Sequence, residues 1–395
     1  MPGREVTAGV SKRVIVLGGG IGGLCTAISL RQTGVDVVVY EQAEVSSQVG
    51  AGLTIWANAI KPLRELGLAD AVIEAGSKIE RGQIRTADGR VLSRSETGEL
   101  ERLFGEPTVA IHRADLHEIL LSALPAGTVR LGAKCTGFEQ EADGVSVRFA
   151  GAPPDRAELV VGADGIHSAV RRQLFPEVGL RYSGYTAWRG VVATRDEAAL
   201  GVTSESWGRG SRFGIVRVDK ERVYWFATAN APAGISLTAA ERKSFLRQRF
   251  RGWHHPVELL LESTPAEEIL QNDIYDLKPM GRWGEGRVIL LGDAAHPTTP
   301  NMGQGACMAI ESSLVLARCL SQEGDLPRAL RRYETARMSR TAWITDQSWK
   351  IGRIGQWENP LACGVRDFLL RITPAGVTRK ALEKAAGYEL GQDAM

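Results

Sequence analysis

The stretch "RVIVLGGGIGGLCTAISLRQTGVDVVVYE" (13–41) sets the fold of the amino-terminal part of the chain. Its first five residues are typical of a short buried strand, and VDVVVYE is typical of a second strand. Between them, glycines fill a turn and apolar residues then recur at helical spacing. This order predicts a strand–helix–strand unit, from which α/β proteins with a parallel sheet are built.

The glycines of the turn form a GxGxxG pattern at Gly18, Gly20 and Gly23. The first permits the tight turn, the second lets the backbone approach a pyrophosphate, and the third lets helix and strand pack closely. Free N–H groups at the helix start attract phosphate. Glu41, with Gln42 beside it, ends the second strand where an acid can bind a ribose diol. The pattern predicts a dinucleotide site and does not distinguish NAD from FAD.

Bulk properties narrow the class of protein. A chain of 395 residues has room for two or three domains or one large α/β body, and its formal net charge of +2 does not favour a nucleic-acid partner. The five cysteines are scattered and contain no CxxC pair, which argues against disulfides and a metal site. No apolar run is long enough to span a membrane, and residues 1–12 lack a signal-peptide core. We expect a cytoplasmic protein.

The pattern of elements changes along the chain. Between residues 183 and 278 the sequence is rich in aromatic and β-branched residues, with one helical segment at 239–253, whereas 304–350 is strongly helical. We therefore expect a Rossmann-like α/β domain that is interrupted by a mostly β substrate domain. The expected division is 13–78, 106–182 and 279–350 for the nucleotide-binding domain, 79–105 and 183–278 for the substrate domain, and 351–395 for a helical tail.

Two further motifs follow expected strands. "GADGIHSAVRR" (162–172) contains Asp164 and Gly165, and "GDAAHPTTPNMGQGACMAIE" (292–311) begins with a Gly-Asp pair and continues into a helix. Together with the first glycine turn, the motifs in this order resemble the single-component flavoprotein monooxygenases, the family of p-hydroxybenzoate hydroxylase. The resemblance covers roughly residues 13–350. It is greatest to the FAD-dependent urate hydroxylases, the 3-hydroxybenzoate 6-hydroxylases and the flavin domain of zeaxanthin epoxidase.

The resemblance implies that FAD is the cofactor and assigns contacts to it. Asp293 would hydrogen-bond the ribityl chain and Arg113 would reach the diphosphate, while Thr54 and Cys135 match looser contact positions. The backbone at the start of the late helix would lie against the pyrimidine edge of the flavin, where its dipole stabilises the anionic reduced ring. The residues of this last contact and of the turn before it are Pro300, Gly303, Gln304, Gly305, Ala306 and Cys307.

Several of these positions have a second interpretation. Arg113 could instead cap a surface helix. Asp164 could touch FAD, organise the approach of NAD(P)H, or cap its own turn. His296 is expected to be a structural hydrogen-bonding residue, and Ala57 stands where relatives usually have proline.

The resemblance also implies the reaction. NADH or NADPH would reduce the flavin, O₂ would add to give a flavin hydroperoxide, and one oxygen would pass to an aromatic or heteroaromatic small molecule. Epoxidation of an alkene and a non-catalytic FAD-binding protein are the alternatives. A monomer or homodimer is expected.

The substrate site is expected against the sheet of residues 183–278. "GSRFGIVRVDKERVYWFATAN" (210–230) is typical of two strands around a turn. With a three-residue turn at 219–221, Tyr224 lies opposite Val216, and Arg212 points to the same face four residues further along. Both match polar substrate-site residues of the urate hydroxylase type. Alternatively, Arg212 is a solvated edge-strand cation and Tyr224 a core aromatic.

Overall fold

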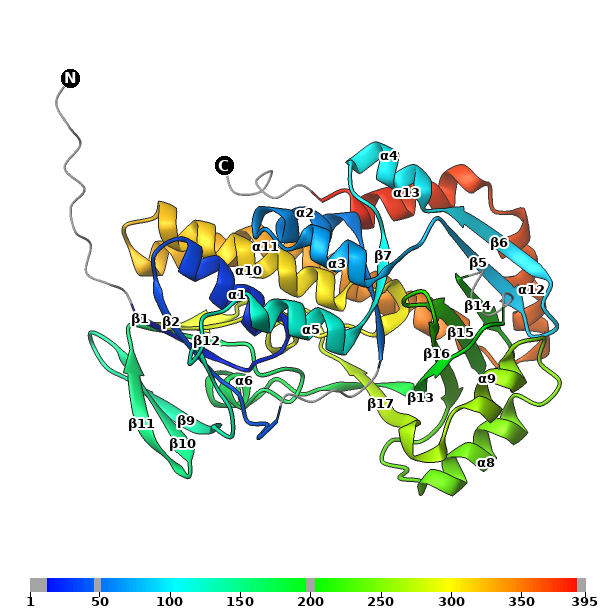
Figure 1. Cartoon of the computed structure of the whole chain (residues 1–395), viewed down its shortest axis with the longest axis horizontal. Coiled ribbons are helices and arrows are strands. Elements are labelled where there is room, and N and C mark those ends of the chain that lie inside the picture. The colour runs from blue at the N-terminus through cyan, green and yellow to red at the C-terminus, as the bar shows by residue number, and fades with distance from the viewer. Residues whose placement is uncertain (1–12, 46–50, 197–202, 389–395) are drawn as a thin grey trace.

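Two sheets of different construction lie side by side along the long axis of the molecule (Figure 1). The structure is a computed structural model that describes residues 13–45, 51–196 and 203–388. The first sheet has six strands, which are parallel apart from the short edge pair β18–β19. In spatial order they are β18 (Gly284–Glu285), β19 (Val288–Leu290), β12 (Leu159–Gly162), β1 (Arg13–Leu17), β2 (Asp36–Tyr40) and β8 (Val129–Arg130).

A layer of helices covers one face of this sheet, and a small sheet lies against the other (Figure 1). Strands β1, β2, β12 and β19 are buried on both faces, which explains their continuous apolar runs. The covering helices are α1 (Ile21–Gln32), α2 (Ala57–Glu65), α3 (Ala69–Ala75), α5 (Arg113–Ser122), α10 (Gly305–Gln322) and α11 (Leu326–Gly355). The small sheet contains β9 (Lys134–Gln140), β10 (Val145–Ala150) and β11 (Ala152–Ala157).

The second large sheet has seven strands from distant parts of the chain. Only the pairing of β14 with β5 is parallel. This pairing joins the hairpin of residues 81–96 to strands that follow residue 180, so both belong to one sheet. In spatial order the strands are β17 (Leu270–Asp276), β13 (Arg181–Ala193), β16 (Arg222–Asn230), β15 (Ser211–Arg217), β14 (Thr203–Trp207), β5 (Arg81–Thr86) and β6 (Val91–Glu96).

The two faces of the second sheet differ. On one face Phe213 and Trp225 stack with their ring centroids 5.5 Å apart. They form a core with α8 (Ala239–Arg249) and α9 (Val257–Ser263). The other face carries Arg212, Tyr224 and Phe226 and is turned toward the half of the molecule that contains the first sheet, since Tyr224 lies against Gly52 of β3 and Arg212 bonds to Asn301.

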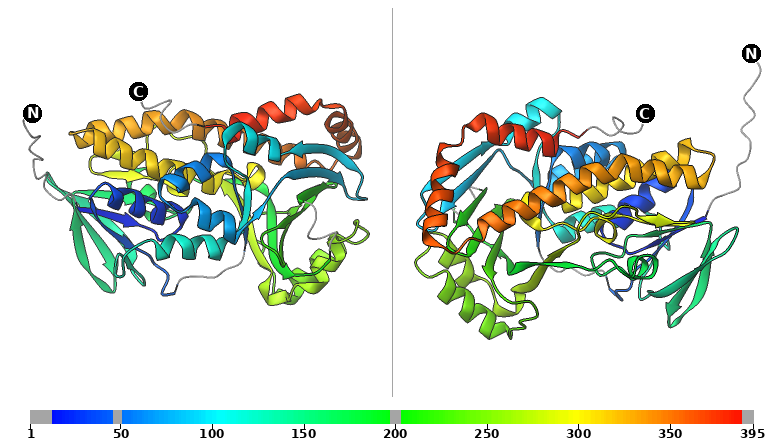
Figure 2. Two further views of the ribbon diagram at one scale, coloured as in Figure 1. Left: turned by 45° about the horizontal axis from the view of Figure 1, so that its top comes forward. Right: turned by 180° about the vertical axis from the view of Figure 1, so that it is seen from behind.

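The carboxyl-terminal helices α12 (Pro360–Ile372) and α13 (Ala375–Ala386) pass along the outer edge of the second sheet and back toward the helices that cover the first sheet (Figure 2). None of the helices in the described part of the chain has the length and apolar character needed to cross a bilayer.

Two features were not among the expectations. Helix α4 (Gly98–Phe104) follows the hairpin of residues 81–96. It has acidic residues in its first turn and Gly105 in the left-handed conformation at its end, both ordinary helix-boundary signals. A small sheet of β3 (Gly52–Ile55), β7 (Val109–His112) and β4 (Ser77–Lys78) also joins segments distant in sequence. The six-part domain division itself stays a prediction.

Candidate functional site

The glycine turn is held by close backbone contacts. Gly18 has φ +110°, and a Cβ there would lie 2.3 Å from the carbonyl oxygen of Ala163. A Cβ on Gly23 would lie 1.9 Å from the carbonyl oxygen of Gly18. These two glycines are therefore required by the packing of strand, turn and helix. A Cβ on Gly20 would have no protein atom within 4 Å. The space beside Gly20 is open, as the approach of a ligand to the backbone requires.

Glu41 is oriented by the same turn. One carboxylate oxygen accepts a hydrogen bond from the N–H of Gly19 at 2.6 Å, and the other accepts from Ala43 at 2.9 Å. Gln42 is exposed beside it. The carboxylate thus stands at the end of β2, next to the turn, with lone pairs left for a diol.

The second motif caps a helix and is tied to the third. One oxygen of Asp164 accepts hydrogen bonds from Ala169 and Val170, the first residues of α6 (Ala169–Leu174). Its other oxygen is buried without a hydrogen-bond partner in the described structure. Arg171 donates to the carbonyl oxygen of Ala294 at 2.8 Å and so joins the two motifs. Capping, one interpretation of Asp164, accounts for only half of its carboxylate.

Asp293 lies where these segments meet. Its side chain is exposed, yet protein surrounds the carboxylate, and this burial raises its pKa although Arg113 and Arg171 oppose the shift. An accessible carboxylate with protein close around it is suited to binding a ligand. Arg113, the first residue of α5, is itself exposed. This part of the structure therefore offers an anionic acceptor and, in its electrostatic field, a cation suited to a diphosphate.

The turn before α10 brings together residues from two parts of the chain. Pro300–Met302 form a 3₁₀ turn, and Gly303 follows with φ +61°. The thiol of Cys307 donates to the carbonyl oxygen of Thr54 at 3.5 Å. The indole nitrogen of Trp56 lies 3.4 Å from where a Cβ on Gly303 would stand, and it is buried without a partner in the described structure. The first turn of α10 exposes part of Gly305 and Ala306.

Cys135 lies away from that turn. It is half-buried on β9, where burial raises the pKa of its thiol and Asp164 raises it further. The structure therefore groups Cys135 with Asp164. The difference from the relatives at Ala57 is mild, because Ala57 is the first residue of α2, a position at which proline and alanine both start a helix.

A buried ionic network supports the start of α10 and was not anticipated from the sequence. The side chain of Gln304 accepts a hydrogen bond from Asn58 at 2.9 Å, and Asn58 also donates to Glu311. Glu311 in turn pairs with Arg337 and Arg340 of α11. The signal available in the sequence is an isolated glutamate inside the apolar stretch MAIESSLV, but its partners lie in other helices.

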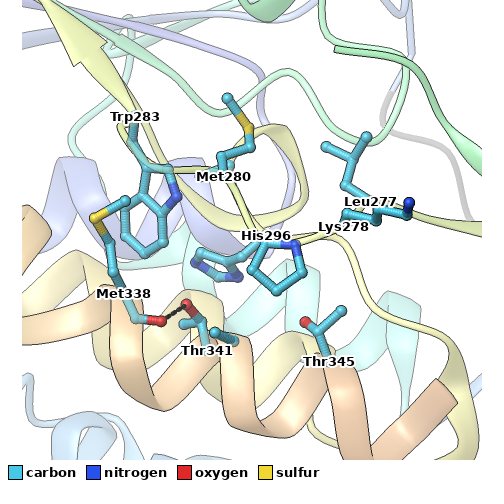
Figure 3. Close-up of a pocket in the computed structure, with 11 residues that line it drawn as sticks. Leu277, Lys278, Met280, Trp283, His296, Met338, Thr341 and Thr345 are labelled. Atoms are coloured by element: carbon cyan, nitrogen blue, oxygen red, sulfur yellow. Dashed lines mark hydrogen bonds between the residues drawn. The ribbon is translucent and has the colours of Figure 1, made fainter. Parts of the chain in front are cut away.

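His296 lines a small pocket together with Trp283 and Thr341 (Figure 3). Burial lowers its pKa to about 3, and Arg337 adds to this effect. Its Nε2 lies 3.2 Å from the hydroxyl of Ser312, and its ring lies 5.1 Å from that of Trp283. A ring that stays neutral and packs in this way fits the expected structural role.

The second sheet has the predicted register. Val216 pairs with Tyr224 across a three-residue turn at 219–221, and Arg212 pairs with Thr228. Tyr224 packs with Ile79, Ala110 and Val218, as the core-aromatic interpretation expects, and burial raises its pKa, although Arg189 opposes the shift.

The interpretation of Arg212 as a solvated edge-strand cation is wrong. β15 is an inner strand, and Arg212 is only 2% exposed. Its nitrogens donate to Gln356 at 3.0 Å, Glu205 at 2.9 Å and Asn301 at 2.7 Å. Because Asn301 belongs to the turn before α10, Arg212 links the second sheet to that turn. This guanidinium is therefore held by the protein rather than open to solvent.

Phe226 lies on the same face as Tyr224 and was not singled out from the sequence. It is half-buried, and a Cβ on Gly214 of the neighbouring strand would lie 2.0 Å from its ring. The ring therefore covers Gly214 of β15. Tyr224 is next to it, with ring centroids 6.1 Å apart.

Replacement of Asp293 tests whether this carboxylate binds FAD. Asp293→Ala is expected to weaken FAD binding by about 1.5–3 kcal/mol, the value of a hydrogen bond to a charged group. This is roughly a ten- to hundredfold rise in Kd, measured by titrating stripped protein with FAD. Glu41→Ala should have a milder effect. Wild-type FAD occupancy in Asp293→Ala would contradict the assignment.

The raised pKa of Asp293 also predicts how the free energy of unfolding depends on pH. Because its pKa is raised in the folded chain, the folded state holds its proton to higher pH than the unfolded state does. Proton binding to Asp293 therefore adds to the free energy of unfolding at low pH, and this addition is lost as pH rises through the raised pKa. Stripped Asp293→Asn should therefore be more stable than stripped wild type at pH 7, and the difference should vanish in acid. Urea unfolding at several pH values measures it.

The geometry fits a bound dinucleotide. It combines an open glycine turn, an acid at the end of β2, the carboxylate of Asp293 with protein close around it, and buried polar atoms of Asp164 and Trp56 that have no partner in the described structure. Residues 11–348 match the model of the FAD binding domain family.

Relatives and solved structures agree with this match. The aurachin C monooxygenase/isomerase of Stigmatella aurantiaca is 45% identical over 359 residues, which are 91% of this chain and 94% of the relative. The 2-heptyl-3-hydroxy-4(1H)-quinolone synthase of Pseudomonas aeruginosa is 34% identical over 376 residues, covering 93% and 96%. The crystal structure of Klebsiella pneumoniae HpxO complexed with FAD and uric acid superimposes with a TM-score of 0.89 at 31% identity, covering 94% and 95%. The chain therefore belongs to the FAD binding domain family, and it is an FAD-dependent monooxygenase.

Proposed function

We propose that the protein hydroxylates a planar heteroaromatic molecule with an apolar substituent, using NADH or NADPH as electron donor and O₂ as oxygen source. The observation that carries the substrate class is Phe226, whose ring covers Gly214 on the face turned toward the nucleotide-binding half. Half-buried Val191 and Val216 flank Tyr224 beside it. An aromatic side chain with aliphatic neighbours favours a planar ring with an apolar substituent.

The names of the relatives favour the same class. The product named for the Pseudomonas synthase is an alkylated quinolone, a bicyclic nitrogen heteroaromatic. The uric acid bound by HpxO is also a bicyclic heteroaromatic, without an alkyl chain. The aliphatic side chains beside Phe226 support the alkylated type.

The cofactor supplies the redox and oxygen-transfer chemistry, and the chain supplies binding and orientation. Asp293 and Glu41 would accept hydrogen bonds from hydroxyl groups, and Arg113 would pair with the diphosphate. The first turn of α10 would place N–H groups and the positive end of an 18-residue helix at the flavin. Tyr224 stays a protonated phenol at neutral pH because its pKa is raised, so it can donate a hydrogen bond but does not act as a base.

A substrate panel tests the proposal. The purified yellow protein is assayed for NADH and NADPH oxidation with 2-heptyl-4(1H)-quinolone, unsubstituted 4-quinolone, urate and no addition. We expect the heptyl compound to stimulate oxidation most and to gain one oxygen by mass. Stimulation by urate alone would contradict the proposed substrate class. Loss of stimulation by the heptyl compound in Phe226→Ala, with FAD content unchanged, would support it.

Arg212 and Tyr224 are proposed to hold the substrate in a fixed position relative to the flavin. In Arg212→Gln the link to Asn301 is lost, so less product should form per NAD(P)H oxidised, by several-fold. Tyr224→Phe removes one hydroxyl and should have a smaller effect of the same kind. Arg217→Gln, on the same strand but bonded to the carbonyl oxygen of Asp219, is the matched control. If both variants retain FAD and wild-type coupling, neither residue acts in the substrate site.

A further inference from the structure

Helix α12 presents apolar side chains to solvent and a charge to the protein. Its buried residues are Cys363 and Arg366. Charged residues are seldom buried and a surface helix normally turns its apolar face inward, so this arrangement is inverted. The exposed fractions of its large apolar residues are Leu361 81%, Val365 56%, Phe368 54%, Leu369 51% and Ile372 56%.

The spacing of these five residues places them on one side of the helix, since residues three, four and seven apart share a face. Arg366 fixes which side faces out. It is 3% exposed, donates to the carbonyl oxygens of Gly208 and Gly355 at 3.2–3.3 Å, and pairs with Asp367. It also lies 5.3 Å from the ring of Trp207. With Arg366 held by these partners, the apolar side cannot rotate into the protein.

The helix lies on the outer edge of the molecule, at the end remote from the nucleotide sheet (Figures 1 and 2). Two more exposed apolar residues lie close in the sequence, Trp357 before α12, 39% exposed, and Val377 near the start of α13, 57% exposed. We call the five residues of α12 with Trp357 and Val377 the α12 face. An exposed apolar surface on a helix is typical of an interaction site.

Charges around the α12 face favour one partner. The exposed cations near it in the sequence are Arg353, Arg371, Arg379 and Lys380, and Arg379 is paired with Glu383. Of the two acidic residues between 353 and 380, Asp367 pairs with Arg366 and Glu358 is exposed. Cations at the rim of an apolar helix are attracted to anionic lipid headgroups. In a two-fold dimer the same cations would confront one another across the patch.

We propose that the α12 face docks the protein onto an anionic lipid bilayer, with its apolar side chains at the boundary between headgroups and acyl chains and Arg353, Arg371 and Lys380 at the headgroups. The helix lies on the membrane in this arrangement. Because α12 packs against β6 of the substrate sheet, docking brings that sheet close to the bilayer.

The test is sedimentation of the FAD-loaded full chain with vesicles of phosphatidylcholine alone or with one quarter phosphatidylglycerol. The triple variant Leu361→Ser/Phe368→Ser/Leu369→Ser removes the centre of the face. The control variant Leu103→Ser/Leu131→Ser/Leu259→Ser changes leucines that are 40–50% exposed elsewhere. We expect wild type and control to bind the anionic vesicles, and the α12 variant to bind at least tenfold more weakly, with FAD content unchanged.

Three results would overturn the proposal. The first is no binding of wild type to either vesicle. The second is equal binding to neutral and anionic vesicles at low salt, since the cations would then select nothing. The third is a dimer in solution that the α12 variant converts to a monomer, which would assign the face to a second copy of the chain.

Discussion

Gly23→Ala is expected to destabilise the folded chain strongly, whereas Gly20→Ala is expected to keep its stability and to bind FAD more weakly. The new Cβ on residue 23 would lie 1.9 Å from the carbonyl oxygen of Gly18, and backbone cannot move aside as a flexible side chain can. We expect a cost of about 3 kcal/mol, at the upper end for overpacking. The new Cβ on residue 20 would meet no protein atom within 4 Å, but it would fill space beside the pyrophosphate site.

Urea unfolding of stripped protein and FAD titration separate the two effects. The free energy of unfolding of Gly20→Ala should lie within about 0.5 kcal/mol of the wild-type value, as for substitutions without contacts. Its affinity for FAD should be at least tenfold lower. Gly324→Ala, at an exposed glycine with no atom near its Cβ, is the control for both measurements. Wild-type FAD affinity in Gly20→Ala would show that the cofactor does not approach this backbone.

Glu311→Ala is expected to destabilise the chain by about 3–5 kcal/mol, the cost of leaving a buried charge without its partner. Glu311 and Arg337 are both fully buried, and Arg340 is 8% exposed by side chain. Burial alone would raise the pKa of Glu311, but Arg337 and Arg340 outweigh it, and the pKa is lowered. The carboxylate is therefore ionised at neutral pH and is the only acid that pairs with the two arginines among the described residues.

The sign of the pH dependence follows from the lowered pKa. The contribution of Glu311 to the free energy of unfolding is present above the pKa of an unfolded glutamate and is lost as pH falls through the folded value. The difference between wild type and Glu311→Gln should therefore shrink in acid. Glu383→Ala, which breaks an exposed pair with Arg379, should cost less than about 1 kcal/mol and is the control. A loss below 1 kcal/mol in Glu311→Ala would contradict the role of the network.

Elements whose pattern is local could be predicted from the sequence. The glycine turn, the strands beside it and the register of Val216 with Tyr224 each depend on residues close in the chain. The Glu311 network could not be predicted, because Asn58 lies 253 residues away in the sequence and comes close only when α2 packs on α10. The strand of Arg212 and the face to which it points were predicted correctly. Its partners Asn301 and Gln356 come from a distant turn and from the end of α11, so its burial could not be predicted from nearby residues.

The strand order has a consequence for synthesis on the ribosome. β1 lies in the middle of its sheet, yet β19 and the turn before α10 are made only after most of the chain. At about 5–20 residues per second, roughly 15–60 s pass before residue 305 is added. During that time Asp293 and the turn before α10, which would contact FAD, have not yet been made. FAD therefore cannot stabilise the nascent chain. We expect the apolar strands β1 and β2 to depend on chaperones until the carboxyl-terminal third arrives, and a shortage of FAD to affect the finished protein rather than its early folding.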